Sequence, residues 1–234
     1  MRFARWSPWI IAVPLLVGHA AGAEEQPGAP REPAPLAARR HTLKDLRDQY
    51  VVKQQLDYSC GAAALATLMR YYFGEPVTEF EILRILESRL SEDEQKRKIA
   101  RGYSLMDLKY VAESKGYQAA GFKLTIDEAR QLAAPVIVHV RPFGYRHFAV
   151  LRGIVGDRVF LADPARGNMR ISIDRFRSEW DGVVFVLGKP GEDAIRSHPL
   201  AVPRPSDAGS VLGLRSLLDL GGATTDVARR IRGR

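Results

Sequence analysis

Apolar side chains recur every three or four positions after residue 60, which is the spacing of one face of a helix. The spacing predicts helices over 61–72, 78–90 and 104–116, with a shorter one from 125 to about 134. The last two begin with capping boxes of the Ser/Thr-x-x-Asp/Glu form. The strongly charged segment 91–101 is predicted to be an exposed loop or helix end.

Further along the chain, β-branched and aromatic runs replace the helical spacing. Separated by Gly, Pro and Asp residues, they predict strands at 136–140, 148–151, 158–161 and 183–187. Helices followed by an antiparallel sheet define the α+β class. The sequence contains no internal repeat and no glycine-rich phosphate-binding loop.

The polar pattern also divides the chain into segments. Residues 1–23 have the basic start, the apolar stretch and the small-residue cleavage site of a secretory signal peptide. An uncleaved membrane anchor is the alternative, although the apolar stretch is shorter than the roughly 20 residues that span a bilayer. Residues 24–42 are predicted to be a disordered linker, 43–190 the folded domain, and 191–234 a weakly ordered tail.

Composition adds two constraints. The chain has 234 residues, is 46% hydrophobic and carries a formal charge of +8, part of which lies in the signal peptide and in the final residues. Basic residues are not interleaved with aromatic ones, so no nucleic-acid partner is predicted. Exported domains that use cysteines structurally need them in pairs. The sequence has one cysteine, which cannot form a disulfide within the chain.

That cysteine, Cys60, stands where a polar stretch changes into a helix. Unpaired N–H groups and the positive end of the helix dipole favour a thiolate at this position, and Gly61 would leave the sulfur open to a substrate backbone. The alternative is a small buried core residue.

A nucleophilic thiol needs a base and a group that orients the base. Within the predicted domain, His147 opens a strand, whereas His139 alternates with valines and could be a core histidine or a ligand. A turn near Gly156 would fold the strand back and bring Asp163 opposite His147, within a register uncertainty of about one to three residues. Asp163 followed by a proline is also an ordinary turn starter.

Taken in order, these residues resemble the bacteriocin-processing cysteine peptidases, peptidase family 39 of the papain-like clan. The resemblance rests on Gln54 and Gln55, Asp57, the run 60–66, Tyr71 and Tyr72, the run 147–151, and the run 163–167.

The resemblance implies a papain-like fold, with the helices packed on the C-terminal sheet. It implies Cys60 as nucleophile, His147 as general base and acid, Asp163 as orienting residue and Gln54 in the oxyanion hole; Gln55 stays open as the alternative for that last role. Many family members are part of a membrane exporter that cleaves after a double glycine. This chain instead resembles a stand-alone exported form, similar to the peptidase of functional-amyloid secretion systems.

We therefore expect a periplasmic cysteine endopeptidase that cleaves a peptide or secretion-system protein through a thioester on Cys60. A glycine-rich cleavage site and an outer-membrane secretion partner are further hypotheses. Two alternatives stay open: an idle module that binds export substrates, and a transpeptidase that passes the acyl group to an amine. No cofactor is expected, because Cys60, His139 and His147 lack the close paired spacing of zinc sites.

Overall fold

The computed structural model describes residues 42–202. The predicted signal peptide, nearly all of the linker and the tail from residue 203 onward lie outside the described residues. Within them, no helix has the length and apolar character needed to cross a membrane. The elements are α1 (Leu43–Asp48), α2 (Cys60–Tyr71), α3 (Glu79–Glu87), α4 (Glu92–Arg101), α5 (Leu105–Ser114), β1 (Gln118–Lys123), α6 (Ile126–Arg130), β2 (Val136–Val140), the 3₁₀ turn η1 (Pro142–Gly144), β3 (His147–Val155), β4 (Arg158–Asp163), β5 (Gly167–Ser172), α7 (Ile173–Glu179) and β6 (Trp180–Gly188).

The four helices predicted from apolar spacing are confirmed as α2, α3, α5 and α6. Both predicted capping boxes form: Ser104 accepts a hydrogen bond from the backbone of Asp107, and Thr125 accepts one from Glu128. The charged segment 91–101 is a complete helix, α4, because its own capping box closes the first turn. None of its residues is buried.

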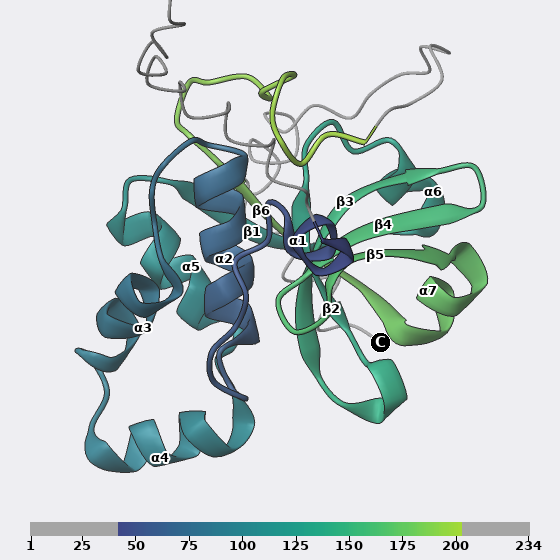
Figure 1. Ribbon diagram of the computed structural model, residues 1–234. Coiled ribbons are helices and arrows are strands. Elements are labelled where there is room, and N and C mark those ends of the chain that lie inside the picture. The colour runs from purple at the N-terminus through teal and green to yellow at the C-terminus, as the bar shows by residue number, and fades with distance from the viewer. Residues whose placement is uncertain (1–41, 203–234) are drawn as a thin grey trace, which may run out of the picture. The chain divides into compact units, whose positions relative to one another are not determined.

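The sheet has six antiparallel strands in the order β1-β6-β2-β3-β4-β5. The four predicted strands are confirmed as β2, β3, β4 and β6. The two strands that the sequence pattern did not indicate, β1 and β5, are the edges of the sheet. Figure 1 shows α2, α3 and α5 grouped on one side of the sheet, with α6 and α7 beside the strands on the other side.

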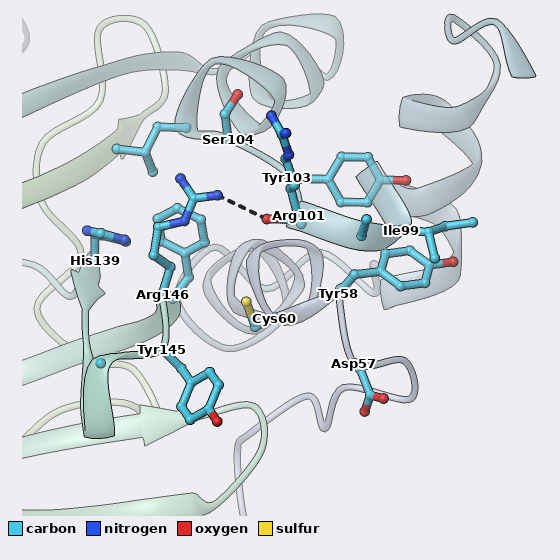
Figure 2. A pocket seen from close by; sticks show the side chains of 15 residues that line it. Asp57, Tyr58, Cys60, Ile99, Arg101, Tyr103, Ser104, His139, Tyr145 and Arg146 are labelled. Carbon is cyan, nitrogen blue, oxygen red and sulfur yellow. Dashed lines mark hydrogen bonds between the residues drawn. The ribbon is translucent and has the colours of Figure 1, made fainter. Parts of the chain in front are cut away.

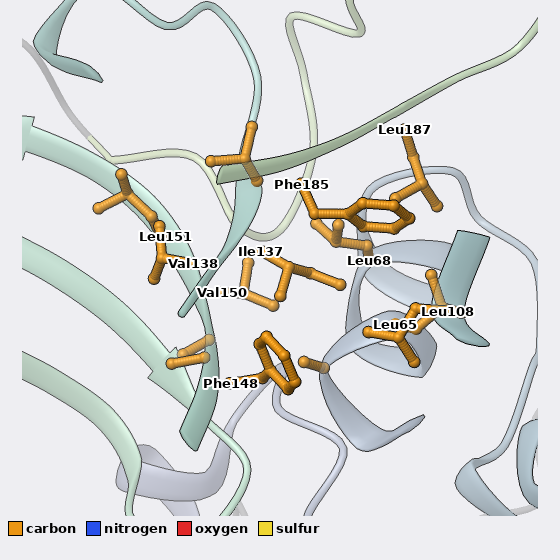
Figure 3. Close-up of a cluster of buried hydrophobic side chains, with 14 of the residues drawn as sticks. Leu65, Leu68, Leu108, Ile137, Val138, Phe148, Val150, Leu151, Phe185 and Leu187 are labelled. Atoms are coloured by element: carbon orange, nitrogen blue, oxygen red, sulfur yellow. The ribbon is translucent and has the colours of Figure 1, made fainter. Parts of the chain in front are cut away.

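The core is one cluster between the sheet and the first helices. Leu65 and Leu68 of α2 and Leu108 of α5 are fully or almost fully buried. They face sheet residues that include Ile137, Phe148, Val150, Phe185 and Leu187 (Figure 3). Packing on the sheet therefore fixes α2, and with it the position of Cys60.

A β-bulge in the β3–β4 hairpin sets which side chains share a face. Near the turn, Gly153 pairs with Phe160; beyond Arg152, Leu151 pairs with Leu161 and Val150 with Ala162. Arg152 is thus the extra residue on β3. Continuing this register sets Asp163 opposite Ala149, which lies on the same face as His147 two positions away. Without the bulge, Asp163 would face the other way.

The start of the predicted weakly ordered tail is packed against the domain, which corrects the expectation for residues 191–202. Leu200 is fully buried. The guanidinium of Arg152 donates hydrogen bonds to the carbonyl oxygens of Pro199, Leu200 and Ala201. Tyr72 adds to this anchoring, because its hydroxyl accepts the backbone N–H of Ile195 and its ring contacts that of His198. A segment that has no helix or strand of its own is therefore held by several contacts with the domain.

Candidate active site

Cys60 is the first residue of α2, where the sequence predicted it, and it is largely buried. The turn before it is built by Ser59, whose hydroxyl donates to the carbonyl of Leu56 at 2.7 Å and accepts from the backbone N–H of Leu56 at 3.2 Å. The first N–H groups of a helix have no partner within the helix. Such donors can stabilise negative charge on or near the sulfur.

Gly61 has a packing role that the sequence did not indicate, and the expectation that it leaves the sulfur open stays a prediction. A Cβ at this position would lie 3.2 Å from Cδ2 of Phe148 and 3.3 Å from Cδ1 of Leu108. Gly61 therefore lets the start of α2 approach the sheet closely. This contact places the thiol near the first residues of β3.

His147 and Asp163 meet on the face that the β-bulge selects. Nε2 of His147 lies 3.1 Å from Oδ1 of Asp163, an ion-pair contact rather than an aligned hydrogen bond. Burial lowers the pKa of His147, but Asp163 and the sulfur of Cys60 outweigh burial and raise that pKa to about 9. Thiol, imidazole and carboxylate thus interact as one set, and the imidazole is cationic at neutral pH.

The Asp163 carboxylate is fully buried and has more partners than the sequence indicated. Oδ1 accepts the backbone N–H groups of Ala165 and Arg166 at 2.8 and 2.9 Å, and Oδ2 accepts Nε and Nη2 of Arg166 at 2.9 and 2.8 Å. Burial alone would raise the pKa of Asp163; His147 and Arg166 reverse this and hold that pKa well below its usual range. Asp163 is therefore a permanent anion beside His147.

Arg166 is the site residue that the sequence reasoning missed. Its spacing of three residues from Asp163 was a signal, since a tight turn can bring residues i and i+3 together. The planar guanidinium then binds one carboxylate oxygen through two N–H groups. Asp163 does start a turn, so its predicted turn role and its contact with His147 coexist.

The segment before Cys60 is tied to the turn that carries Asp163. The backbone N–H of Gln54 donates to the carbonyl of Pro164 at 3.1 Å, and Nζ of Lys53 donates to that of Ala165 at 2.7 Å. Gly167, after this turn, allows α1 to pack closely against it, because a Cβ at Gly167 would lie only 2.6 Å from the carbonyl oxygen of Arg47. Nucleophile loop and carboxylate turn are thereby held in one position.

The two glutamines differ in their surroundings. Gln54 is half-buried; its Nε2 donates to the carbonyl of Leu56 at 3.0 Å, and its Oε1 is buried without a partner among the described residues. Gln55 is exposed, and its side chain donates to the carbonyl of Lys53. The backbone N–H of Gln55 is held by the buried carboxylate of Glu79. Neither glutamine side chain lines the cleft described next.

A cleft of roughly 650 Å³ opens at Cys60. Figure 2 shows Tyr58, Ile99 and Tyr103 on one side of the sulfur, from the loop before α2 and from α4 and the loop after it. His139 of β2 and Tyr145 and Arg146 of the loop before β3 lie on the other side. Phe148 of β3 also lines the cleft. The cleft is large enough for a few residues of an extended peptide.

His139, which the sequence left open between core residue and ligand, has a carboxylate partner of its own. Its Nδ1 lies 2.6 Å from Oδ2 of Asp181. The ring lies on the cleft side of β2, since His139 pairs with Phe148 and both line the cleft. Among residues 42–202, no three His, Cys, Asp or Glu side chains are grouped as metal ligands would be. The absence of a cofactor stays a prediction.

A helix-borne cysteine facing a histidine on an antiparallel sheet is the arrangement of papain-like peptidases. The profile of the peptidase C39 family matches residues 48–192, and the chain belongs to this family.

Individual relatives agree. The chain is 34% identical over 162 residues to the probable functional amyloid protease FapD of Pseudomonas aeruginosa, which covers 69% of this chain and 70% of that protein. It is 32% identical over 190 residues to FapD of Pseudomonas fluorescens, covering 79% and 83%. The peptidase domain of Streptococcus ComA, a bi-functional ABC transporter, shares the fold at 22% identity with a TM-score of 0.51, covering 59% of this chain and 97% of the domain.

Proposed function

We propose that this protein is a cysteine endopeptidase whose nucleophile is Cys60. The observation that supports it most is the interaction of the Cys60 thiol, the His147 imidazole and the buried Asp163 carboxylate, with Cys60 itself lining an open cleft. Membership of the peptidase C39 family gives the same reaction class.

In the proposed reaction, the Cys60 sulfur attacks the carbonyl carbon of a peptide bond and forms a tetrahedral intermediate. Protonated His147 gives its proton to the leaving amine, and a thioester on Cys60 remains. Neutral His147 then takes a proton from water, which attacks the thioester and releases the new carboxyl end. Asp163 keeps the imidazole oriented and stabilises its cationic form.

The oxyanion would be stabilised by the backbone N–H of Cys60 and by the amide of Gln54. The supporting observations are that Gln54 is half-buried on the loop bonded to Pro164, and that only one of its two amide N–H groups has a partner among residues 42–202. Gln55 is exposed and bonded to Lys53, so it is the weaker candidate.

The experiment compares the chain from Glu24 with its Cys60→Ala variant on a proteome-derived peptide library, with products mapped by mass spectrometry. We expect new peptide ends from the first protein and none from the second, with equal thermal unfolding of the two. Identical product maps would contradict a peptidase. Products extended by an added amine, in place of free carboxyl ends, would indicate the transpeptidase alternative.

An idle substrate-binding module would give a third outcome: peptides retained by both proteins and cut by neither. We consider this alternative less well supported, because the structure keeps thiol, base and carboxylate in contact.

We further propose that the mature protein acts in the periplasm on a peptide or protein of a secretion system. The signal-peptide pattern of residues 1–23 and the functional-amyloid names of the FapD relatives support this. Expression of the full chain in a Gram-negative host, followed by N-terminal sequencing, tests it. A periplasmic product that begins near Glu24 is expected; a membrane-bound product that keeps Met1 would overturn it.

A further inference from the structure

The cleft carries a positively charged group whose role the proposed reaction does not explain. Arg146 precedes His147 in the chain, and the two side chains leave the backbone in different directions. His147 faces Asp163, whereas Arg146 lines the cleft together with His139 and Phe148. In Figure 2 the Arg146 guanidinium lies between His139 and the wall formed by Arg101 and Tyr103.

The hydrogen bonds of Arg146 leave most of its donors free. Nη2 donates to the carbonyl oxygen of Arg101 at 3.2 Å. Among residues 42–202, no carboxylate lies within ion-pair distance of Arg146, and its Nε and Nη1 have no hydrogen-bond partner. A guanidinium presents its N–H groups as a rigid fork that matches a carboxylate. The fork is therefore available to a ligand in the cleft.

Neither Asp57, which lines the cleft, nor Asp181, the partner of His139, neutralises this charge. Asp57 lies on the far side of Cys60 from Arg146 (Figure 2). Asp181 is occupied by Nδ1 of His139, by the backbone N–H of Val183 and by Arg141 at 3.7 Å. The sheet-side wall is consequently cationic at the level of Arg146.

The loop before Arg146 has a defined backbone, although residues 143–146 are exposed. Pro142 is buried, and the 3₁₀ turn is closed by hydrogen bonds from Gly144 to the Arg141 carbonyl and from Tyr145 to that of Pro142. Phe143 adopts a left-handed conformation, with φ of 53°, which costs a non-glycine residue energy. A short, strained turn anchored at both ends limits the positions that Arg146 can reach.

From these observations we infer that Arg146 forms an anionic subsite, which binds an acidic side chain of the substrate close to the bond that is cut. The inference rests on the proposed peptidase function for its substrate class, a peptide with Asp or Glu near the scissile bond. His139, whose Nε2 has no hydrogen-bond partner within the described part of the chain, lies beside the same subsite.

The first test needs no substrate and no turnover. Cys60 is alkylated with iodoacetate, an anion, and with neutral iodoacetamide; in each case an S–C bond forms and iodide leaves. Arg146→Gln should lower the ratio of the two rates about threefold or more, because the anionic reagent loses its binding partner. Arg146→Lys, which keeps the charge, should restore part of the ratio.

Arg101→Gln is the matched control. It removes one positive charge from the same cleft rim but keeps the carbonyl that accepts from Arg146, and its side chain points away from Cys60 (Figure 2). We expect its ratio to equal that of the unsubstituted protein. An unchanged ratio in Arg146→Gln, or an equal fall in Arg101→Gln, would overturn the subsite.

The second test uses the peptide library. Sites cut by the unsubstituted protein should be enriched in Asp or Glu at one position within about four residues of the cut. The preference for Asp over Asn, or Glu over Gln, at that position should fall about tenfold in Arg146→Gln. Arg146→Glu should instead favour Lys or Arg at the same position. Equal profiles would contradict the inference and leave the peptidase intact. If no peptide is cut at all, the proposed function fails and the alkylation ratio alone decides the subsite.

Discussion

The sheet carries two histidine–carboxylate pairs, and they differ in surroundings more than in distance. The His139–Asp181 contact is the shorter, at 2.6 Å, against 3.1 Å for His147–Asp163. Yet the side chain of Asp181 is 29% exposed, whereas that of Asp163 is 0% exposed. The carboxylate with the longer contact is the one that is removed from water.

The partners of each carboxylate widen the difference. Asp163 receives two backbone N–H groups and two N–H groups of Arg166, and its histidine also interacts with Cys60. Asp181 receives one backbone N–H, and its arginine lies 3.7 Å away. The comparison teaches that the length of a contact does not rank the two pairs: burial and a complete set of partners favour His147–Asp163 as the pair that we propose for proton transfer.

The largest expected effect separates the two pairs by activity. His147→Gln and Asp163→Asn should each lower kcat/KM on a peptide from the library by roughly 10²- to 10⁴-fold, because the base is lost or misoriented. His139→Gln is the control and should lower it less than about tenfold. Equal losses in both pairs would mean that the sheet holds one extended proton-transfer network.

The second prediction concerns the titration of the His147 ring. In ¹⁵N-imidazole spectra, His147 should titrate near pH 9, and Asp163→Asn should shift that midpoint down, because burial then acts with less opposition. The pKa of His147 in the folded protein lies above its unfolded value of about 6.5. Protonated His147 therefore contributes fully to stability below about pH 6.5, and this contribution is lost as the pH rises through about 9. Stability in Asp163→Asn should therefore depend less on pH across this window. A midpoint that Asp163→Asn leaves unmoved would refute the assignment.

The third prediction tests the support of the buried carboxylate. Arg166→Gln removes two charge-assisted hydrogen bonds from Asp163 and should lower the free energy of unfolding by about 1–3 kcal/mol. Arg177→Gln breaks an exposed pair with Asp174 and should cost less than about 0.5 kcal/mol. Urea unfolding of both variants measures the difference, and similar losses would show that Asp163 does not depend on Arg166.

The smallest effect is expected at the second pair. Asp181→Asn keeps an oxygen that can accept from Val183 or from His139, so kcat should change less than about threefold. Activity assays alongside the His147 and Asp163 variants provide the measurement. A loss as large as that of Asp163→Asn would assign Asp181 to the reaction.

The sequence predicted the interior of the fold better than its edges. Strands β2, β3, β4 and β6 are apolar runs because both faces of much of the central sheet are covered. The edge strands β1 and β5 contain Gln, Gly, Asn and Arg, and have no continuous apolar face to indicate them. Helix α4 has no buried residue, so apolar spacing could not indicate it; its capping box, its strong helix formers and the order of acidic before basic residues were the signals.

For the site, residue types and order were predictable, but their geometry was not. Cys60, His147 and Asp163 were chosen from position and chemistry, and their roles remain predictions to be tested. Arg166 was missed, and the Asp181 partner of His139 lies 42 residues away in the sequence. The Arg166 contact is local, and the turn that begins at Asp163 could have indicated it, whereas the contact of His139 with Asp181 is not visible before the register of the sheet is known.

The bulge at Arg152 has a consequence for how this strand can change over evolutionary time. Side chains alternate between the two faces of a strand, so their assignment depends on whether an even or an odd number of residues separates two positions. Losing one residue between His147 and the turn at Gly156 would turn the histidine away from Asp163, although nothing near the thiol had been altered. Losing two residues there would return His147 to the face of the sheet that it shares with Asp163. Family members should therefore tolerate length changes in β3 in steps of two more readily than in steps of one.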